Sequence, residues 1–142
     1  MDTKGQIDRL QTIQNIAARI VLRRRKFDHI TPCLMSLHWL RIEERILFKL
    51  LATTFKSIHG IAPGYLRELV KVYEPKRSLR LKNRQALLIV PKYNMVTYGK
   101  RAFTIAAPTE WNMLPEELRT ITEYDTFKRK LKTYLFKLSY NC

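Results

Sequence analysis

The amino-acid sequence predicts a mainly α-helical fold: a small helical domain with a short β-hairpin insertion. Apolar residues recur at helical spacing in three long segments, which favours helices over strands. One central segment lacks this period and favours a hairpin. A length of 142 residues, with 46% hydrophobic and 27% charged residues, is typical of one globular unit. We therefore expect a single domain over residues 1–142.

The first helix is predicted over residues 6–23, and the basic cluster Arg23–Lys26 that follows suits a helix C-terminus. Thr31 is expected to cap a second, short helix, which places Pro32 at its first position and runs toward Leu37. The apolar stripe of the first helix consists of Ile7, Leu10, Ile13, Ala17 and Ile20.

The widest apolar stripe predicts a helix from about Arg41 to His59, which we expect to be the most buried element. Gly60 is expected to end it, because glycine readily adopts the left-handed backbone conformation that often follows a helix. Pro63 is expected to start another short helix that runs through Val70. The stripe consists of Ile42, Ile46, Leu50, Leu51, Phe55 and Ile58.

The centre of the chain predicts the hairpin, around Leu87 to Val96. The run Ala86–Val90 is short, apolar and β-branched, and Pro91 follows it, so it favours a strand. Residues Lys92–Asn94 would form the turn, and Met95–Tyr98 would form the returning strand. A buried helical turn would give the same short apolar run, and that alternative stays open.

The C-terminal third predicts a loop, a helix start and one long helix. Thr104 to Asn112 surround Pro108 and are expected to form a loop that leads into a helical turn. Pro115 is expected to precede a helix start with acidic residues in its first turn. Asp125 or Thr126 should cap the last helix, whose apolar face consists of Phe127, Leu131, Tyr134, Leu135 and Leu138.

The net charge is strongly positive and is concentrated in the centre of the chain. Lysine and arginine number 27 against 12 acidic residues, which gives a formal charge of +15. A surplus of this size points to a polyanionic partner, and RNA or DNA ranks first. Glu74 is the one acidic residue between positions 71 and 101. The nine basic residues there are Lys71, Lys76, Arg77, Arg80, Lys82, Arg84, Lys92, Lys100 and Arg101.

Aromatic residues lie among these basic residues, as in proteins that hold phosphates while bases stack on aromatic rings. Tyr93 and Tyr98 are the best stacking candidates, with Tyr73 and Phe103 nearby. We therefore predict a nucleic-acid-binding surface formed by the nine basic residues together with Tyr93 and Tyr98. Two alternatives stay open: the charges form a solvated face, and the aromatics belong to the core.

No residue pattern indicates catalysis, a metal site or a cofactor. The aspartates are isolated from one another, whereas two-metal chemistry needs converging carboxylates. His29, Cys33 and His38 superficially suit zinc, but they offer three ligands at most. The glycines form no phosphate-binding loop, and the serines lack a nucleophile context. We expect a non-enzymatic, cofactor-free protein.

Two further features concern the cellular compartment. No uncharged stretch is long enough to span a bilayer, and the N-terminus carries no apolar signal segment. Cys33 and Cys142 cannot form a disulfide framework, which is typical of a reducing compartment. We expect an intracellular protein without a membrane partner.

Eight short motifs, in order along residues 10–132, resemble the C-terminal region of non-LTR retrotransposon reverse transcriptases of the jockey-like type. Arg41 and Glu110 depart from the family pattern, where proline and an apolar residue are usual. The motifs are LQxIQNxAAR at 10–19, DHITP at 28–32, LHWL at 37–40, RI at 45–46, HGxAPxYL at 59–66, YGxRAF at 98–103, APxxWNxLP at 107–115 and FKxxLK at 127–132.

The resemblance implies a region that follows the polymerase thumb, in a parent protein that copies its RNA at a nicked chromosomal target. The endonuclease and the polymerase palm, with its paired aspartates, are absent from this sequence. The resemblance therefore implies a non-catalytic fragment of an RNA-directed DNA polymerase, located in the nucleus, that helps hold template RNA or target DNA. It also suggests the polymerase domains of the parent protein as a partner.

Two rival functions remain. One is a protein-interaction or structural module, in which the apolar stripe from Phe127 to Leu138 docks on the polymerase thumb and the basic surplus is incidental. The other is a binder of anionic membranes or acidic proteins through the basic end of the first helix.

Overall fold

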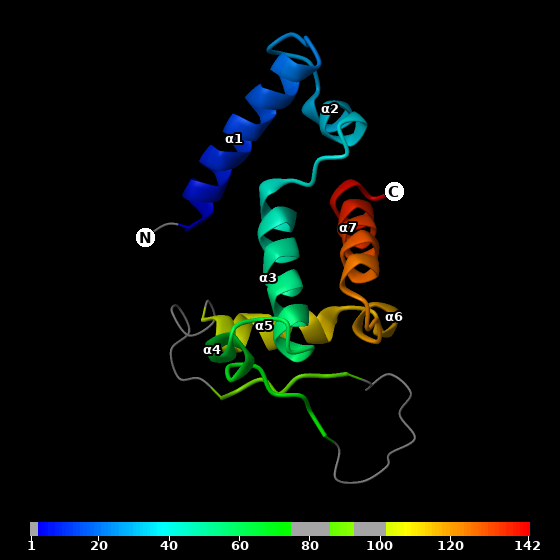
Figure 1. Cartoon of the computed structure of the whole chain (residues 1–142). Helices are drawn as coiled ribbons and strands as arrows, with labels where there is room; N and C mark the ends of the chain where they lie inside the picture. Colours follow the sequence, from blue (N-terminus) through cyan, green and yellow to red (C-terminus); the bar gives the residue numbers. More distant parts are fainter. Residues whose placement is uncertain (1–2, 75–85, 93–101) are drawn as a thin grey trace. The chain divides into compact units, whose positions relative to one another are not determined.

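The computed structural model describes residues 3–74, 86–92 and 102–142, and these residues form seven helices and no sheet (Figure 1). The prediction of a mainly helical fold is confirmed. The helices are α1 (Thr3–Val21), α2 (Ile30–Ser36), α3 (Ile42–Ile58), α4 (Gly64–Arg67), α5 (Phe103–Met113), α6 (Glu116–Arg119) and α7 (Tyr124–Tyr140).

The predicted hairpin around Leu87 to Val96 is not supported. Within the described residues, the run Ala86–Val90 pairs upstream instead, through an isolated antiparallel bridge between Val72 and Leu88. The backbone groups of the run are therefore partly satisfied by residues that precede it in the sequence. The predicted return strand, Met95–Tyr98, lies outside the described residues.

The start of α2 differs from the prediction. The helix begins at Ile30, His29 occupies the N-cap position, and no side chain caps it. Thr31 is therefore inside the first turn, and Pro32 is the third helical residue. Proline is tolerated there because the first N–H groups of a helix have no intrahelical partner.

The predicted loop from Thr104 to Asn112 is wrong, because these residues lie within α5 despite Pro108. Proline removes one helical hydrogen bond, but the alanines around it favour helix and Pro108 is itself buried. The burial of Trp111 at 0% exposure adds a packing gain that outweighs the lost bond. Tertiary packing thus overrides the local signal of proline.

The last two helices begin close to where the sequence predicts. Pro115 precedes α6, as expected. For α7 the start is earlier than predicted: the helix begins at Tyr124, and the backbone N–H of Phe127 donates to the carbonyl of Glu123. The Thr126 hydroxyl donates to the Glu123 carboxylate, so Thr126 lies inside the first turn.

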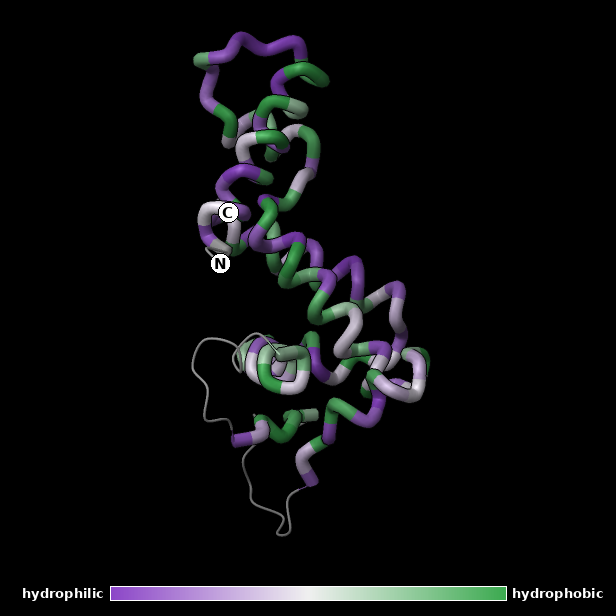
Figure 2. Tube along the Cα trace, turned by 90° about the vertical axis from the view of Figure 1, so that its left-hand side faces the viewer, coloured by the Kyte–Doolittle hydropathy of each residue, from purple (hydrophilic) through white to green (hydrophobic). Residues whose placement is uncertain are grey.

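The chain divides into two compact units, and the prediction of one domain over residues 1–142 stays a prediction. Unit 1 comprises Met1–Phe48 and Leu131–Cys142, and unit 2 comprises Lys49–Lys130. In unit 1, α1 and α2 pack together around Ala18, Cys33 and Leu34. The loop between these two helices is hydrophilic, and it is the purple stretch at the top of Figure 2.

The apolar stripe of α1 does not face the core of unit 1. Ile13 and Ile20 are 63% and 71% exposed, whereas Gln14 is buried. The Gln14 side chain donates to the carbonyl of Leu40 at 2.8 Å, and Gln11 accepts from the N–H of Ile42 at 2.9 Å. The α2–α3 connection therefore has its backbone groups satisfied by glutamines of α1, and this turns the apolar stripe outward.

A second contact in unit 1 involves the end of α7. The Tyr140 hydroxyl donates to the carbonyl of Trp39 at 2.6 Å, and the Arg41 guanidinium lies 5.5 Å from the centre of the Tyr140 ring. Burial raises the pKa of Tyr140, and the nearby Arg41 opposes this shift. The contact holds the α2–α3 connection against the last turn of α7.

Unit 2 is built around an aromatic cluster. The ring of Phe55 lies 4.4 Å from that of Phe127 and 6.5 Å from that of Trp111, centre to centre. All three side chains are fully buried. The second half of α3 is accordingly buried, whereas Ile46 in its first half is 51% exposed. This helix was expected to be the most buried element, and the structure shows buried residues only in its second half.

Four helices end in the same way, with one residue in the left-handed conformation. After α3 this residue is Gly60, at φ 73°, and the N–H of Ile61 donates to the carbonyl of Lys56. This confirms Gly60 as the stop of the helix. The corresponding residues after α1, α2 and α7 are Arg23, His38 and Asn141.

Candidate nucleic-acid interface

Two extended stretches of unit 2, residues 71–74 and 86–92, lie side by side near α4 and α5 (Figure 1). The N–H of Tyr73 donates to the carbonyl of Leu87 at 2.8 Å, and the N–H of Ile89 donates to that of Lys71 at 2.9 Å. We call these two stretches, with Trp111 and Asn112 of α5, the bridge framework.

Asn112 fixes the second stretch to α5 by two hydrogen bonds to one residue. Its Oδ1 accepts from the N–H of Leu88 at 2.8 Å, and its Nδ2 donates to the carbonyl of Leu88 at 2.9 Å. The Leu88 side chain is 3% exposed. Because one amide side chain satisfies both backbone groups, the buried leucine leaves neither of them unpaired.

Trp111 fixes the start of the same stretch. Its indole Nε1 donates to the carbonyl of Ala86 at 2.8 Å, and this bond satisfies the one polar atom of a fully buried side chain. Ala86 has a φ of 54°, a left-handed conformation that costs a non-glycine residue about 1–2 kcal/mol. Local strain thus accompanies the point where the chain enters the second stretch.

Two of the predicted site residues lie in this framework, and both are exposed: Lys71 and Lys92. Residues 75–85 connect the two paired stretches along the chain, and residues 93–101 connect Lys92 to Ala102, the N-cap of α5. The other predicted site residues lie in those connections, outside the described residues: Lys76, Arg77, Arg80, Lys82, Arg84, Tyr93, Tyr98, Lys100 and Arg101.

The remaining aromatic candidates are placed by the structure. Tyr73 is 41% exposed and belongs to the first stretch of the framework. Phe103 is half-buried and is the first residue of α5. The Tyr73 side chain is therefore accessible to a ligand, whereas the Phe103 side chain is partly covered by the protein.

A pair of lysines on one tyrosine is a cationic feature that the sequence analysis missed. The ammonium groups of Lys56 and Lys128 lie 4.8 and 4.6 Å from the centre of the Tyr124 ring. Lys128 also forms a 2.9 Å ion pair with Asp125, whose pKa is lowered by the hydrogen bond with Lys128. A spacing of 68 residues separates Lys56 from Tyr124, so no local pattern could reveal the pair.

Cys33 and His38, two of the residues considered as zinc ligands, contact other parts of unit 1. The Cys33 thiol lies 3.5 Å from the carbonyl of His29, and His38 stacks on Phe136 with ring centres 6.1 Å apart. Across residues 3–74, 86–92 and 102–142, no cluster of three histidine, cysteine or acidic residues could hold a metal ion.

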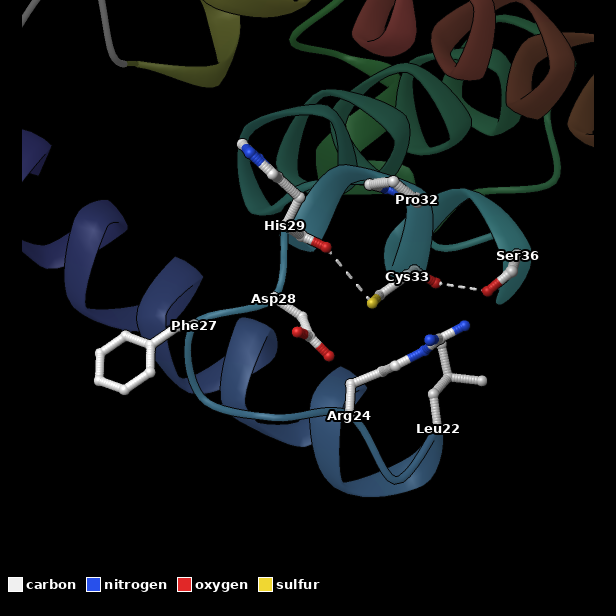
Figure 3. A pocket seen from close by; sticks show the side chains of 8 residues that line it. All are labelled: Leu22, Arg24, Phe27, Asp28, His29, Pro32, Cys33 and Ser36. Atoms are coloured by element: carbon white, nitrogen blue, oxygen red, sulfur yellow. Dashed lines mark hydrogen bonds between the residues drawn. The ribbon is translucent and has the colours of Figure 1, made fainter.

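A cavity of about 640 Å³ opens beside Cys33 (Figure 3). The Cys33 thiol and the Asp28 carboxylate point toward its middle, whereas Phe27 points away from it. Asp28 accepts from the backbone N–H of Arg25 at 3.0 Å, so its charge already has a partner. The lining residues are Leu22, Arg24, Phe27, Asp28, His29, Pro32, Cys33 and Ser36.

The adjacent glutamates occupy helix starts. Glu43 and Glu44 lie in the first turn of α3, and Glu116 and Glu117 lie in that of α6. Carboxylates stabilise the positive end of a helix dipole there, and neighbouring residues on a helix point apart. Neither pair converges on a common point as two metal ions would require.

Comparisons with known proteins add no relative: no protein-family model, curated protein or solved structure matches the chain. Within the part of the chain that the structure describes, none of the helices has the length and apolar character needed to cross a membrane. The resemblance to retrotransposon reverse transcriptases therefore rests on the eight sequence motifs alone.

Proposed function

We propose that this chain is a non-catalytic nucleic-acid-binding domain that holds RNA or DNA through residues 71–101. The observation that carries the proposal is the bridge framework, which joins two stretches of the most basic part of the chain, residues 71–74 and 86–92, to each other and to α5. Lys71 and Lys92 are exposed on it. Nine basic residues against one acidic residue in this range favour a phosphate backbone as the ligand.

The framework supports the proposal because it gives Lys71 and Lys92, the two predicted site residues that the structure describes, a fixed base. Binding costs less when the contacting groups are held in place beforehand. Asn112 and Trp111 hold residues 86–88 by three hydrogen bonds, and the bridge holds residues 71–73 to them. Residues 75–85, with five basic side chains, join these two fixed stretches.

In the proposed mechanism, basic side chains contact phosphates and aromatic rings stack on unpaired bases. Phosphate contacts give affinity without sequence preference, whereas stacking favours single strands. Tyr93 and Tyr98 remain our stacking candidates, and Tyr73 joins them because it is exposed on the framework.

We further propose the role that the sequence resemblance suggests: the region after the thumb of a retrotransposon-encoded RNA-directed DNA polymerase, acting in the nucleus with the polymerase domains of the parent protein. The aspartates of the sequence are Asp2, Asp8, Asp28 and Asp125, and each is isolated. We therefore propose that another part of such a protein performs the catalysis.

The rival function, docking on the thumb through the stripe from Phe127 to Leu138, is less well supported. Phe127, Leu131 and Leu135 are at most 1% exposed, so most of that stripe is already covered. A docking surface must be accessible to its partner, and of these residues only Leu138 is strongly exposed, at 55%.

The test is fluorescence anisotropy with labelled single-stranded RNA and duplex DNA, using the full chain. Replacing Arg80, Lys82 and Arg84 by glutamine should weaken binding to both ligands roughly tenfold or more, at about 0.5–1 kcal/mol for each contact. The matched control replaces Lys130, Lys132 and Lys137 of α7, which are exposed, and removes the same charge. Equal losses in the two triple variants would show that net charge alone attracts the ligand and would refute the proposed surface.

A further inference from the structure

The most unusual surface of the molecule is an apolar face on α1 that nothing in unit 1 covers. We call it the α1 apolar face, and it spans about three successive turns of the helix. Its side chains are between 50% and 71% exposed. Apolar side chains at helical spacing are normally the buried side of a helix. The face consists of Leu10, Ile13, Ile16, Ile20 and Val21.

The opposite side of α1 explains why this face stays outside. Gln11 and Gln14 bond to each other and to the backbone of the α2–α3 connection, at Ile42 and Leu40. Rotating the helix to bury the isoleucines would break these bonds and leave backbone groups unpaired. The orientation of α1 is therefore fixed by specific polar contacts, and its apolar face remains available.

The charges along α1 and directly after it are mostly positive. Between residues 3 and 26 the sequence holds seven basic residues and a single acidic one, Asp8. Four of the seven form the run Arg23–Lys26 directly after the helix, and all four are exposed. The others are Lys4, Arg9 and Arg19.

A hollow at the C-terminal end of the face is lined by both apolar and basic side chains. It measures about 370 Å³ and is lined by Ile16 and Ile20 together with three basic side chains, Arg19, Arg24 and Lys26. Such a hollow suits an apolar side chain that enters between the isoleucines while a neighbouring carboxylate meets the cations.

We propose that the α1 apolar face is the docking site for an acidic amphipathic helix of a partner protein. Charge complementarity selects this occupant, because a carboxylate-bearing helix compensates the surrounding cations and also covers the isoleucines. A second copy of the chain would bring the same positive charge to the interface. Nucleic acid would meet aliphatic side chains, which provide no ring on which a base can stack.

The test measures binding of the full chain, without nucleic acid, to two designed helical peptides of about 18 residues. Both carry leucines at helical spacing, and the remaining surface is glutamate-rich in one and lysine-rich in the other. The glutamate peptide should bind roughly tenfold or more tightly than the lysine peptide. Replacing Ile16 and Ile20 by glutamine should weaken its binding by roughly tenfold or more.

Two variants serve as controls. Met113→Gln changes an apolar residue that is equally exposed, at 71%, but lies in unit 2, and it should leave peptide binding unchanged. Reversing two charges at the hollow, with Arg24→Glu and Lys26→Glu, should strongly reduce the preference for the glutamate peptide, because five basic and three acidic residues then remain between positions 3 and 26. A preference that this variant leaves unchanged would contradict the proposal.

Several outcomes would overturn the proposal. One is equal affinity for the two peptides, or binding that the Ile16→Gln, Ile20→Gln variant leaves unchanged. Another is a dimeric chain that this variant makes monomeric, since a second copy would then cover the face. If the Ile16→Gln, Ile20→Gln variant lost binding to phosphatidylserine vesicles but kept its binding to the glutamate peptide, the face would be assigned to a membrane. A clear drop in the melting temperature of this variant would show that the chain itself buries the face.

Discussion

Asn112 offers the sharpest test of how the bridge framework is held. In Asn112→Ala the N–H and the carbonyl of Leu88 both lose their partner. An unsatisfied backbone group in a protein interior costs about 1–3 kcal/mol, and water can reach part of this site. We therefore expect a loss of about 2–4 kcal/mol in the free energy of unfolding for the two groups together.

The assay is urea unfolding followed by circular dichroism. Met113→Ala is the matched control, because its side chain is 71% exposed on the same helix, and its effect should stay within about 0.5 kcal/mol. An Asn112→Ala variant as stable as the parent would refute the role that we assign to the paired hydrogen bonds.

The Asn112→Asp variant tests the two hydrogen bonds separately, because the new carboxyl can donate to the Leu88 carbonyl only when it is protonated. A carboxylate still accepts from the N–H of Leu88, but it repels the carbonyl oxygen that the asparagine amide contacts. Protonation restores a donor, so the folded state should raise the pKa of the new carboxyl. The deficit in stability should therefore shrink as the pH falls from about 7 to about 4. A deficit that does not change with pH would contradict this reasoning.

Three further predictions concern the fold and are checked by the same unfolding assay. Gly60→Ala should cost about 1–2 kcal/mol through its positive φ, whereas Gly64→Ala, where φ is not positive, should be nearly neutral. Phe127→Ala should cost about 3–5 kcal/mol, because the ring is fully buried in the aromatic cluster; a smaller loss would mean that the cluster is loosely packed. Tyr140→Phe should cost about 1 kcal/mol at neutral pH by removing the bond to Trp39. Because burial raises the pKa of Tyr140, its contribution should be lost as the pH rises above about 10, and the Phe variant should lack that loss.

The period of the apolar residues predicted the long helices well. It did not predict α5 or most of the helix ends. The three long helices lie where apolar residues repeat, because a repeat of this period places the apolar side chains on one side of a helix. α5 was missed, since Pro108 is a local signal for a loop and the burial of Trp111 is not visible locally. Helix ends show the same limit: Gly60 was predictable, whereas Arg23 and His38 take the same conformation without any residue preference for it.

The orientation of α1 could not be predicted from its pattern. A hydrophobic stripe shows that a helix has an apolar side, but not which surface covers that side. The glutamine contacts that orient α1 join residues 26 and 31 positions apart in the sequence. Pairings over such distances depend on how the chain folds and leave no periodic signal.

For the candidate site, the count of charges located the basic range. It did not reveal the hydrogen bonds of Trp111 and Asn112 that hold part of this range. Residues 71–101 stood out because one sign of charge dominates there. Trp111 and Asn112 lie in one of the eight motifs, and their hydrogen bonds reach 25 and 24 residues back along the chain, respectively. An asparagine directly after a tryptophan is the one local signal that could have suggested such a role.

The salt dependence of RNA binding tests the central claim most directly. If residues 71–101 engage six or more phosphates, the affinity of the full chain for single-stranded RNA should fall roughly 300-fold or more between about 50 and 200 mM salt. Replacing Arg80, Lys82 and Arg84 by glutamine should flatten the log–log slope by about 0.7 for each lost contact with a single strand. The α7 triple variant, at Lys130, Lys132 and Lys137, should keep the parent slope. An Arg80, Lys82 and Arg84 variant that stays folded and retains the parent affinity and slope would contradict the account.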